Sequence, residues 1–224
     1  MIENVSFDSE LFAVKRLAEG VYALIEREER TGSNAGIIDL GNKTIVFDTF
    51  LNIDAALDMK RACVELTGRM PSYVVVSHRH MDHIMGNCLF PESAIISSSA
   101  TRDAVAETRE VFEKEQHEYG PRAEEIREIL KAGADQSKIA DLTNELNFVA
   151  NMAKPGAAVR VPDVTIDHEM VLYGDRRRVC LSVYPAGHSM GDVAAYLPED
   201  KIVFAGDLLF VEHHPWIGRG VPDR

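Results

Sequence analysis

The sequence predicts one α+β domain over residues 1–224, in which two β-rich halves pack together and a helical segment is inserted between them. Short β-rich segments lie within residues 21–49 and 73–98, with one helix expected between them, and similar segments return from residue 157. Between them, residues 101–152 are rich in Glu, Arg, Lys and Ala, a composition typical of helices. No short repeat or low-complexity linker separates the halves, so we expect them to share one core.

The first half is expected to form a strand meander, then a helix and two further strands. Gly41-Asn42 supplies a hairpin-type turn. A helix is expected over residues 53–67, where apolar side chains recur at helical spacing and Gly68 follows as a C-cap residue. YVVVS is apolar at successive positions, which predicts a strand covered on both faces. The expected strands are VYALIE (21–26), GIIDL (36–40), KTIVFDT (43–49), YVVVS (73–77) and AIISS (94–98).

The inserted segment is expected to hold two or three helices, because Gly120-Pro121 ends one helix and starts another. An apolar stripe follows, formed by Ile139, Leu142, Leu146 and Val149. It suits a cover packed on the rest of the chain, a lid over a site or a dimer seam, and its spacing favours none of the three. The strands expected after it are AAVRV (157–161), VTID (164–167), MVLYG (170–174), VCLSVYP (179–185), VAAYL (193–197) and KIVFAG (201–206).

The charge balance argues against polyanionic partners. The chain has 36 acidic residues against 24 Lys and Arg, a formal net charge of -12. Such a field repels phosphate backbones and anionic lipid, so we expect neither nucleic acid nor a membrane as a partner. The one basic cluster, RRR at 176–178, is interpreted as a solvated hairpin tip.

Cysteine content and the N-terminus favour a cytoplasmic location. Cys63, Cys88 and Cys180 are too few and too scattered for a disulfide framework, and we expect them to be small buried residues. The N-terminal segment has acidic residues where a signal peptide has basic ones, and no apolar run approaches membrane-spanning length.

The stretch HRHMDH, residues 78–83, places metal-competent side chains directly after an apolar strand. His78 and His80 are two positions apart, and a turn or helix start would bring Asp82 and His83 round beside them. Neutral imidazole and carboxylate suit zinc and related divalent ions, and the absence of thiolates argues against a closed structural site. The alternative, a polar loop with incidental histidines, fits an isolated HxH better than the full HxHxDH.

Two later blocks also follow apolar strands. PAGHSMGD (185–192) places His188 between glycines, which allow a loop to approach a metal closely. IVFAGDLLF (202–210) ends its strand at Asp207, whose carboxylate is a further candidate oxygen ligand. Taken singly, GHSxGD is weak evidence, and a strand-end Asp is more often a turn residue.

HxHxDH, GHSxGD and the strand-end Asp occur in an order that resembles the metallo-β-lactamase superfamily of metallo-hydrolases, over nearly all of the chain from VYALIE to GDLLF. The resemblance implies a four-layer αββα sandwich with a dinuclear site at one edge of its two sheets. Zinc is the preferred metal, with iron or manganese as alternatives, since His and Asp donors suit all three. The implied ligands are His78, His80 and His188 for the first divalent ion, Asp82 and His83 for the second, and Asp207 as the bridge.

Other positions follow the family pattern less closely. Asp48 matches an early strand motif that supports the metal site from behind, with a plain turn as the alternative. Ser33 and Asn34 match too, without an assigned chemistry. The pattern contains one more histidine in a later Gly-His motif, which these 224 residues lack, so we expect a C-terminal portion to be missing. Otherwise His213 and His214 are candidate substitutes or substrate contacts, or belong to a packed loop.

The implied function is hydrolysis of an ester, thioester, lactone or amide-like bond in a small-molecule substrate by a metal-bound hydroxide. Asp82 is the catalytic candidate, because its carboxylate would orient the hydroxide and pass a proton to the leaving group. The alternatives are a phosphodiesterase or nuclease of the same superfamily, which the acidic charge disfavours, and a non-catalytic metal-binding protein. A flavodiiron-type redox protein is disfavoured because that pattern has Glu where this chain has His80. A homodimer through the inserted helices is a further expectation.

Overall fold

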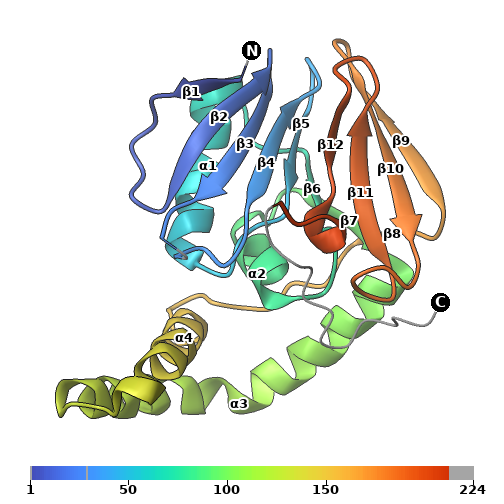
Figure 1. The fold of residues 1–224 in the computed structure, drawn as a ribbon. Helices are drawn as coiled ribbons and strands as arrows, with labels where there is room; N and C mark the ends of the chain where they lie inside the picture. Colours follow the sequence, from blue (N-terminus) through green and yellow to red (C-terminus); the bar gives the residue numbers. More distant parts are fainter. Residues whose placement is uncertain (1, 29, 212–224) are drawn as a thin grey trace.

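The computed structural model describes residues 2–28 and 30–211, which form two β-sheets packed face to face with helices on one side (Figure 1). The predicted α+β class with two packed sheets is confirmed. The first sheet contains, in spatial order, β1 (Glu3–Val5), β2 (Phe12–Ala18), β3 (Val21–Glu26), β4 (Ala35–Asp39), β5 (Thr44–Phe47), β6 (Tyr73–Val75), β7 (Ala94–Ser98) and β8 (Val164–Ile166). The second contains β12 (Ile202–Phe204), β11 (Asp192–Leu197), β10 (Arg178–Tyr184) and β9 (Glu169–Tyr173).

The first sheet is buried on both faces, as its continuous apolar runs require. Strands β1 to β5 pair antiparallel, and β5 to β8 pair parallel. Val74 faces the helical layer, whereas the next residue, Val75, faces the second sheet, and both are fully buried. On the outer face of the second sheet, Tyr173, Tyr196 and Val203 are exposed, and no α-helix in the described part of the chain covers them (Figure 1).

Helix α1 (Ile53–Thr67) covers the first sheet and has the predicted bounds. The side chain of Asn52 accepts hydrogen bonds from the backbone N–H groups of Asp54 and Ala55, which caps the first turn. Gly68 ends the helix with φ 73°, and its N–H donates to the carbonyl of Val64. The buried face of α1, with Met59 and Cys63, packs on the sheet.

The insertion forms a helical hairpin that extends away from the sheets in Figure 1. It consists of α3 (Ser99–Lys131) and α4 (Gln136–Met152). The expected break at Gly120-Pro121 is wrong: α3 continues through Pro121, because a helix that packs against a partner tolerates the loss of one backbone hydrogen bond. Leu142, Leu146 and Val149 pack in the hairpin core between α3 and α4. Most of the apolar stripe is thus used within the chain, and the homodimer stays a prediction.

Three other expectations differ from the structure. Residues 157–161 form no strand, although Ala157 and Val159 are buried in alternation, because no strand among the described residues pairs with this backbone. Strands β1 and β2 were not predicted. RRR lies at the β9–β10 turn as expected, but Arg177 is buried and paired with Asp200.

The cysteines are all free, and only Cys63 is fully buried. No helix among the described residues is long and apolar enough to cross a membrane. The cytoplasmic location stays a prediction.

Candidate metal centre

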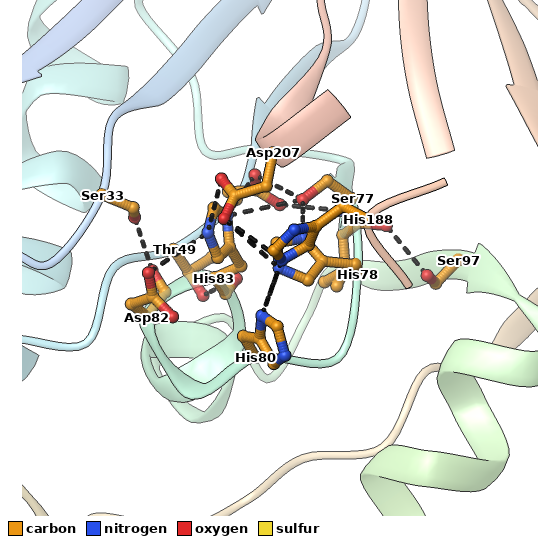
Figure 2. Close-up of polar contacts among 12 residues, drawn as sticks. Ser33, Thr49, Ser77, His78, His80, Asp82, His83, Ser97, His188 and Asp207 are labelled. Atoms are coloured by element: carbon orange, nitrogen blue, oxygen red, sulfur yellow. Dashed lines mark hydrogen bonds and ion pairs between the residues drawn. The ribbon is translucent and has the colours of Figure 1, made fainter. Parts of the chain in front are cut away.

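The six predicted ligands come together at one edge of the two sheets, where several strands end. His78 and His80 lie on the loop after β6, rather than on a continuing strand. The short helix α2 (Met81–Ile84) begins directly after His80 and carries Asp82 and His83. The loop between β10 and β11 carries His188, and the 3₁₀ helix η2 (Gly206–Leu208) after β12 carries Asp207. Figure 2 shows Asp207 between two groups of side chains.

The first group consists of three histidines and one oxygen of Asp207. Nδ1 of His80 lies 2.9 Å from Nε2 of His78 and 3.0 Å from Nε2 of His188. Oδ2 of Asp207 lies 3.8 Å and 3.4 Å from the same two Nε2 atoms. A tetrahedral site with metal–nitrogen distances of about 2.0–2.1 Å places neighbouring donor atoms about 3.3 Å apart. The four measured distances lie on both sides of this value, so the four donors fit one divalent ion.

The second group consists of Asp82, His83 and the other oxygen of Asp207. Nε2 of His83 lies 3.3 Å from Oδ2 of Asp82 and 3.3 Å from Oδ1 of Asp207. This Nε2 atom is buried and makes no hydrogen bond of good geometry to any described residue. A buried ring nitrogen that faces two carboxylate oxygens in this way has the surroundings of a ligand to a cation. Asp207 therefore directs one oxygen to each group (Figure 2).

Asp48 supports both groups from behind the site. Its Oδ1 accepts a hydrogen bond from the backbone N–H of Ser77 at 2.7 Å, and its Oδ2 accepts from Oγ of Ser77 at 2.8 Å. Oδ2 also lies 2.8 Å from Nδ1 of His83, and since a carboxylate only accepts, Nδ1 carries the proton. Ser77 Oγ lies 2.9 Å from Nδ1 of His78 and has donated its own proton to Asp48, so Nδ1 of His78 is the donor. Both histidines then direct Nε2 lone pairs at the site.

This result decides between the two interpretations of Asp48: it holds the His83 ring in place and is not a plain turn residue. Ser77 was not among the predicted site residues, although its position at the end of YVVVS, next to His78, was a usable signal.

The electrostatic environment favours neutral first-group imidazoles. Burial, together with neighbouring His83, His80 and His188, holds the pKa of His78 well below its ordinary value. Burial and His188 likewise lower the pKa of His80. Neutral imidazole is the form that binds metal.

The second group behaves differently. Burial disfavours a charged His83, but the carboxylates of Asp48 and Asp82 outweigh burial and raise its pKa. Burial alone would raise the pKa of Asp82, yet His83 outweighs it and the pKa is lowered. The carboxylates around His83 therefore favour positive charge at this point, whether a proton or a metal ion supplies it.

Two backbone features position Asp207. Gly206 has φ 52°, a left-handed conformation, and a Cβ added there would lie 2.5 Å from Cβ of Ser77. Only glycine allows η2 to approach the loop that carries His78 this closely.

A cleft of about 1040 Å³ opens onto the site and is lined by His80, Asp82, His83 and Asp207 among others. Its further walls include Leu51, Met81, Phe148 and Phe204, and none of the described residues that line it is Lys or Arg. Phe148, on α4, was not expected at the site.

The remaining candidates lie outside the donor groups. Ser33 donates from Oγ to the backbone carbonyl of Asp82, and Asn34 Oδ1 accepts from the N–H of Glu26. Both side chains therefore stabilise the backbone of neighbouring segments. His213 and His214 lie outside the described residues.

Comparison with known proteins identifies the family. A sequence profile described as the metallo-β-lactamase superfamily matches residues 29–224. The chain belongs to this superfamily. The resemblance drawn from HxHxDH, GHSxGD and Asp207 is thereby confirmed, and so is the expectation that the chain has the fold of a family of hydrolases. This fold implies that divalent metal is bound. The identity and number of the metal ions stay predictions.

Relatives and solved structures agree with this assignment. The chain is similar to the acyl-coenzyme A thioesterase MBLAC2 of Gallus gallus, with 25% identity over 216 residues, covering 90% of this chain and 67% of the relative. The Homo sapiens MBLAC2 thioesterase is 23% identical over 219 residues with the same coverage.

Among solved structures, the metallo-β-lactamase from Pontibacter korlensis has 15% identity and a TM-score of 0.51, over 92% of this chain and 71% of that one. DIM-1 metallo-β-lactamase exposed to ceftazidime has 12% identity and a TM-score of 0.59, over 95% and 80%. These two similarities concern the fold alone.

Proposed function

We propose that the chain is a metal-dependent hydrolase with two divalent ions, preferably zinc, that cleaves an ester, thioester, lactone or amide-like bond in a small molecule. One observation carries the proposal: the two oxygens of Asp207 face two separate donor groups, as a bridging ligand does. His78, His80 and His188 would hold one ion, and Asp82 and His83 the other. A second observation supports it: Asp48 and Ser77 direct the ring nitrogens of two of these histidines at the site.

Divalent ions bound there would supply a Lewis acid and an activated water at neutral pH. The side chains of the protein would position the water and the substrate. Asp82 lines the cleft, so its carboxylate is placed to hold the attacking water and to pass a proton to the leaving group. A substrate bound against the apolar walls would displace water from the reacting bond, which strengthens electrostatic interactions at the site.

Among the candidate bonds we propose the acyl thioester as the first to be tested. The MBLAC2 relatives are named acyl-coenzyme A thioesterases, and the apolar cleft suits an acyl group. Phosphodiester substrates are disfavoured, because the described lining contains no Lys or Arg and the chain carries a net charge of -12. We therefore propose a small-molecule substrate and no nucleic acid partner.

The test combines metal analysis with turnover. The purified protein is expected to bind near two zinc ions per chain and to hydrolyse acyl thioesters, and Asp207→Ala is expected to lose both properties. His117→Ala is the matched control, because His117 is exposed and lies outside the donor groups. Unchanged metal content and turnover in Asp207→Ala would defeat the proposal. A chain that binds no metal at all would be the non-catalytic alternative.

A further inference from the structure

The wall of the cleft opposite the sheets comes from the inserted hairpin. Phe148, near the C-terminal end of α4, lines the same cleft as His80, Asp82 and Asp207, although it is far from all three in sequence. In Figure 1 this end of α4 lies below α2, while the rest of the hairpin extends away from the sheets. The hairpin thus supplies one aromatic side chain to the site.

The position of Phe148 is fixed by the residues around it. Val149 and Met152 are buried, and the buried side chain of Asn151 accepts a hydrogen bond from the backbone N–H of Ile53 at 3.2 Å. Two residues after the end of α4, Lys154 forms an ion pair with Asp54 at 2.7 Å. These contacts attach the end of α4 to the start of α1, so Phe148 is a fixed wall rather than part of a mobile lid.

An aromatic contact fixes the ring from the other side. The rings of Tyr119 and Phe148 meet edge to face, with centroids 6.3 Å apart, and Tyr119 in turn contacts the buried ring of Phe112 at 5.8 Å. Phe148 is therefore held by α3 as well as by α1, and it presents a rigid apolar surface to whatever enters the cleft.

The chemistry of the cleft limits what this surface meets. A substrate whose scissile carbonyl lies at the donor groups must place one of its two flanking groups along the cleft. The polar lining includes the carboxyl groups of Glu26, Asp82 and Asp207, and no described lining residue is Lys or Arg. An alkyl chain would be stabilised against Leu51, Met81 and Phe148. A phosphate-bearing leaving group would find no Lys or Arg among the described lining residues to pair with.

We propose that Phe148 packs against the acyl chain of the substrate, so that the inserted hairpin determines which acyl-chain lengths the enzyme prefers. The proposal rests on the hydrolase function proposed above. Each CH₂ group removed from water strengthens binding by about fourfold, so a ring that covers one or two of them contributes about tenfold. The effect should appear only for chains long enough to reach the ring.

The test compares Phe148→Ala with wild type on acetyl, octanoyl and palmitoyl thioesters. The expected result is a loss of about tenfold in kcat/KM for the longer chains, with the acetyl thioester changed by less than about twofold. Phe148→Leu should retain part of the preference. Leu146→Ala is the control, because Leu146 lies on the same helix and packs in the hairpin core without lining the cleft. Equal losses on all three substrates, or no change on any, would overturn the proposal.

A second measurement separates this proposal from the hydrolase function. Binding of dansyl-labelled undecanoate is followed by fluorescence for wild type, Phe148→Ala and Leu146→Ala. Weaker binding in Phe148→Ala alone supports the acyl subsite even if the protein hydrolyses no thioester. If the protein hydrolyses thioesters but neither fatty-acid binding nor chain-length preference depends on Phe148, the hydrolase function is supported and the acyl subsite is refuted.

Discussion

Replacement of Asp48 by Asn tests whether the buried carboxylate orients the metal-binding histidines. Asn is the suitable substitution because Asp48 has φ 58°, a left-handed conformation that Asn tolerates and Ala does not. The amide oxygen still accepts from the N–H of Ser77, but the amide nitrogen is a donor. Since Nδ1 of His83 is also a donor, at 2.8 Å, the two groups repel unless the imidazole proton moves to Nε2. In that form His83 cannot bind a metal.

The expected cost has two parts of different size. A hydrogen-bonded carboxylate behind a ligating histidine contributes about 10–100-fold to metal affinity, so the ion near His83 should be lost first. The free energy of unfolding of the metal-free protein should fall by about 1–3 kcal/mol, since one buried hydrogen bond is left poorly satisfied. Titration with a chromophoric chelator measures the two affinities, and urea denaturation measures the stability.

Asp39→Asn is the matched control. Asp39 is also buried and accepts from the backbone N–H of Gly41 and from Arg69 at 2.6 Å, remote from the donor groups. This variant should lose stability and keep both metal affinities. If Asp48→Asn binds both ions as tightly as wild type, or if Asp39→Asn loses metal equally, Asp48 has no orienting role and the reasoning fails.

Three further predictions concern backbone, ion pairing and thiol chemistry. Gly206→Ala should bind metal at least tenfold more weakly by chelator titration, because the added Cβ would clash with Ser77. Gly68→Ala is the control: Gly68 has a similar positive φ, but no described atom would lie within 4 Å of the added Cβ, so the free energy of unfolding should fall by only about 1 kcal/mol while metal affinity stays unchanged. Arg177→Met should lower the urea midpoint by an amount equivalent to about 3 kcal/mol, since it leaves a partly buried aspartate unpaired, and retained stability would contradict this. Cys63, whose pKa burial raises to about 12, stays protonated at pH 8 and should resist iodoacetamide until the chain unfolds; mass spectrometry of the native protein detects any exception.

The convergence of the candidate metal donors was predictable because the signals in the sequence are local. HxHxDH places four donors on a few residues after one strand, and GHSMGD and AGD repeat the arrangement at the ends of β10 and β12. The packing of the two sheets then brings these strand ends to one edge, where the N–H of Val193 donates to the carbonyl of Ser77. Helix α1 was predictable for the same reason, since its spacing and Gly68 lie within the segment itself.

The errors arose where long-range packing overrules local signals. Pro121 is a start signal in isolation, but α4 packs along α3 and stabilises one continuous helix. Alternating burial at Ala157 and Val159 imitates a strand, but no partner strand in the described part of the chain lies beside this backbone. Arg177 was predicted to lie in a solvated hairpin tip, but it is buried because it pairs with Asp200, 23 positions away.

The position of Phe148 is likewise set by long-range packing, which shows why a site can be predictable while its substrate specificity is not. Its place in the cleft depends on Asn151 meeting the start of α1, 98 positions away in sequence, and on Tyr119 from α3. No spacing rule connects these residues to the histidines. Reaction chemistry needs donor atoms placed within tenths of an ångström, which short motifs supply, whereas substrate choice needs only a wall of suitable shape, which any packed insertion provides. The hairpin can therefore change acyl preference without disturbing the donor groups, and variants at Phe148 should alter selectivity while metal content stays at its wild-type value.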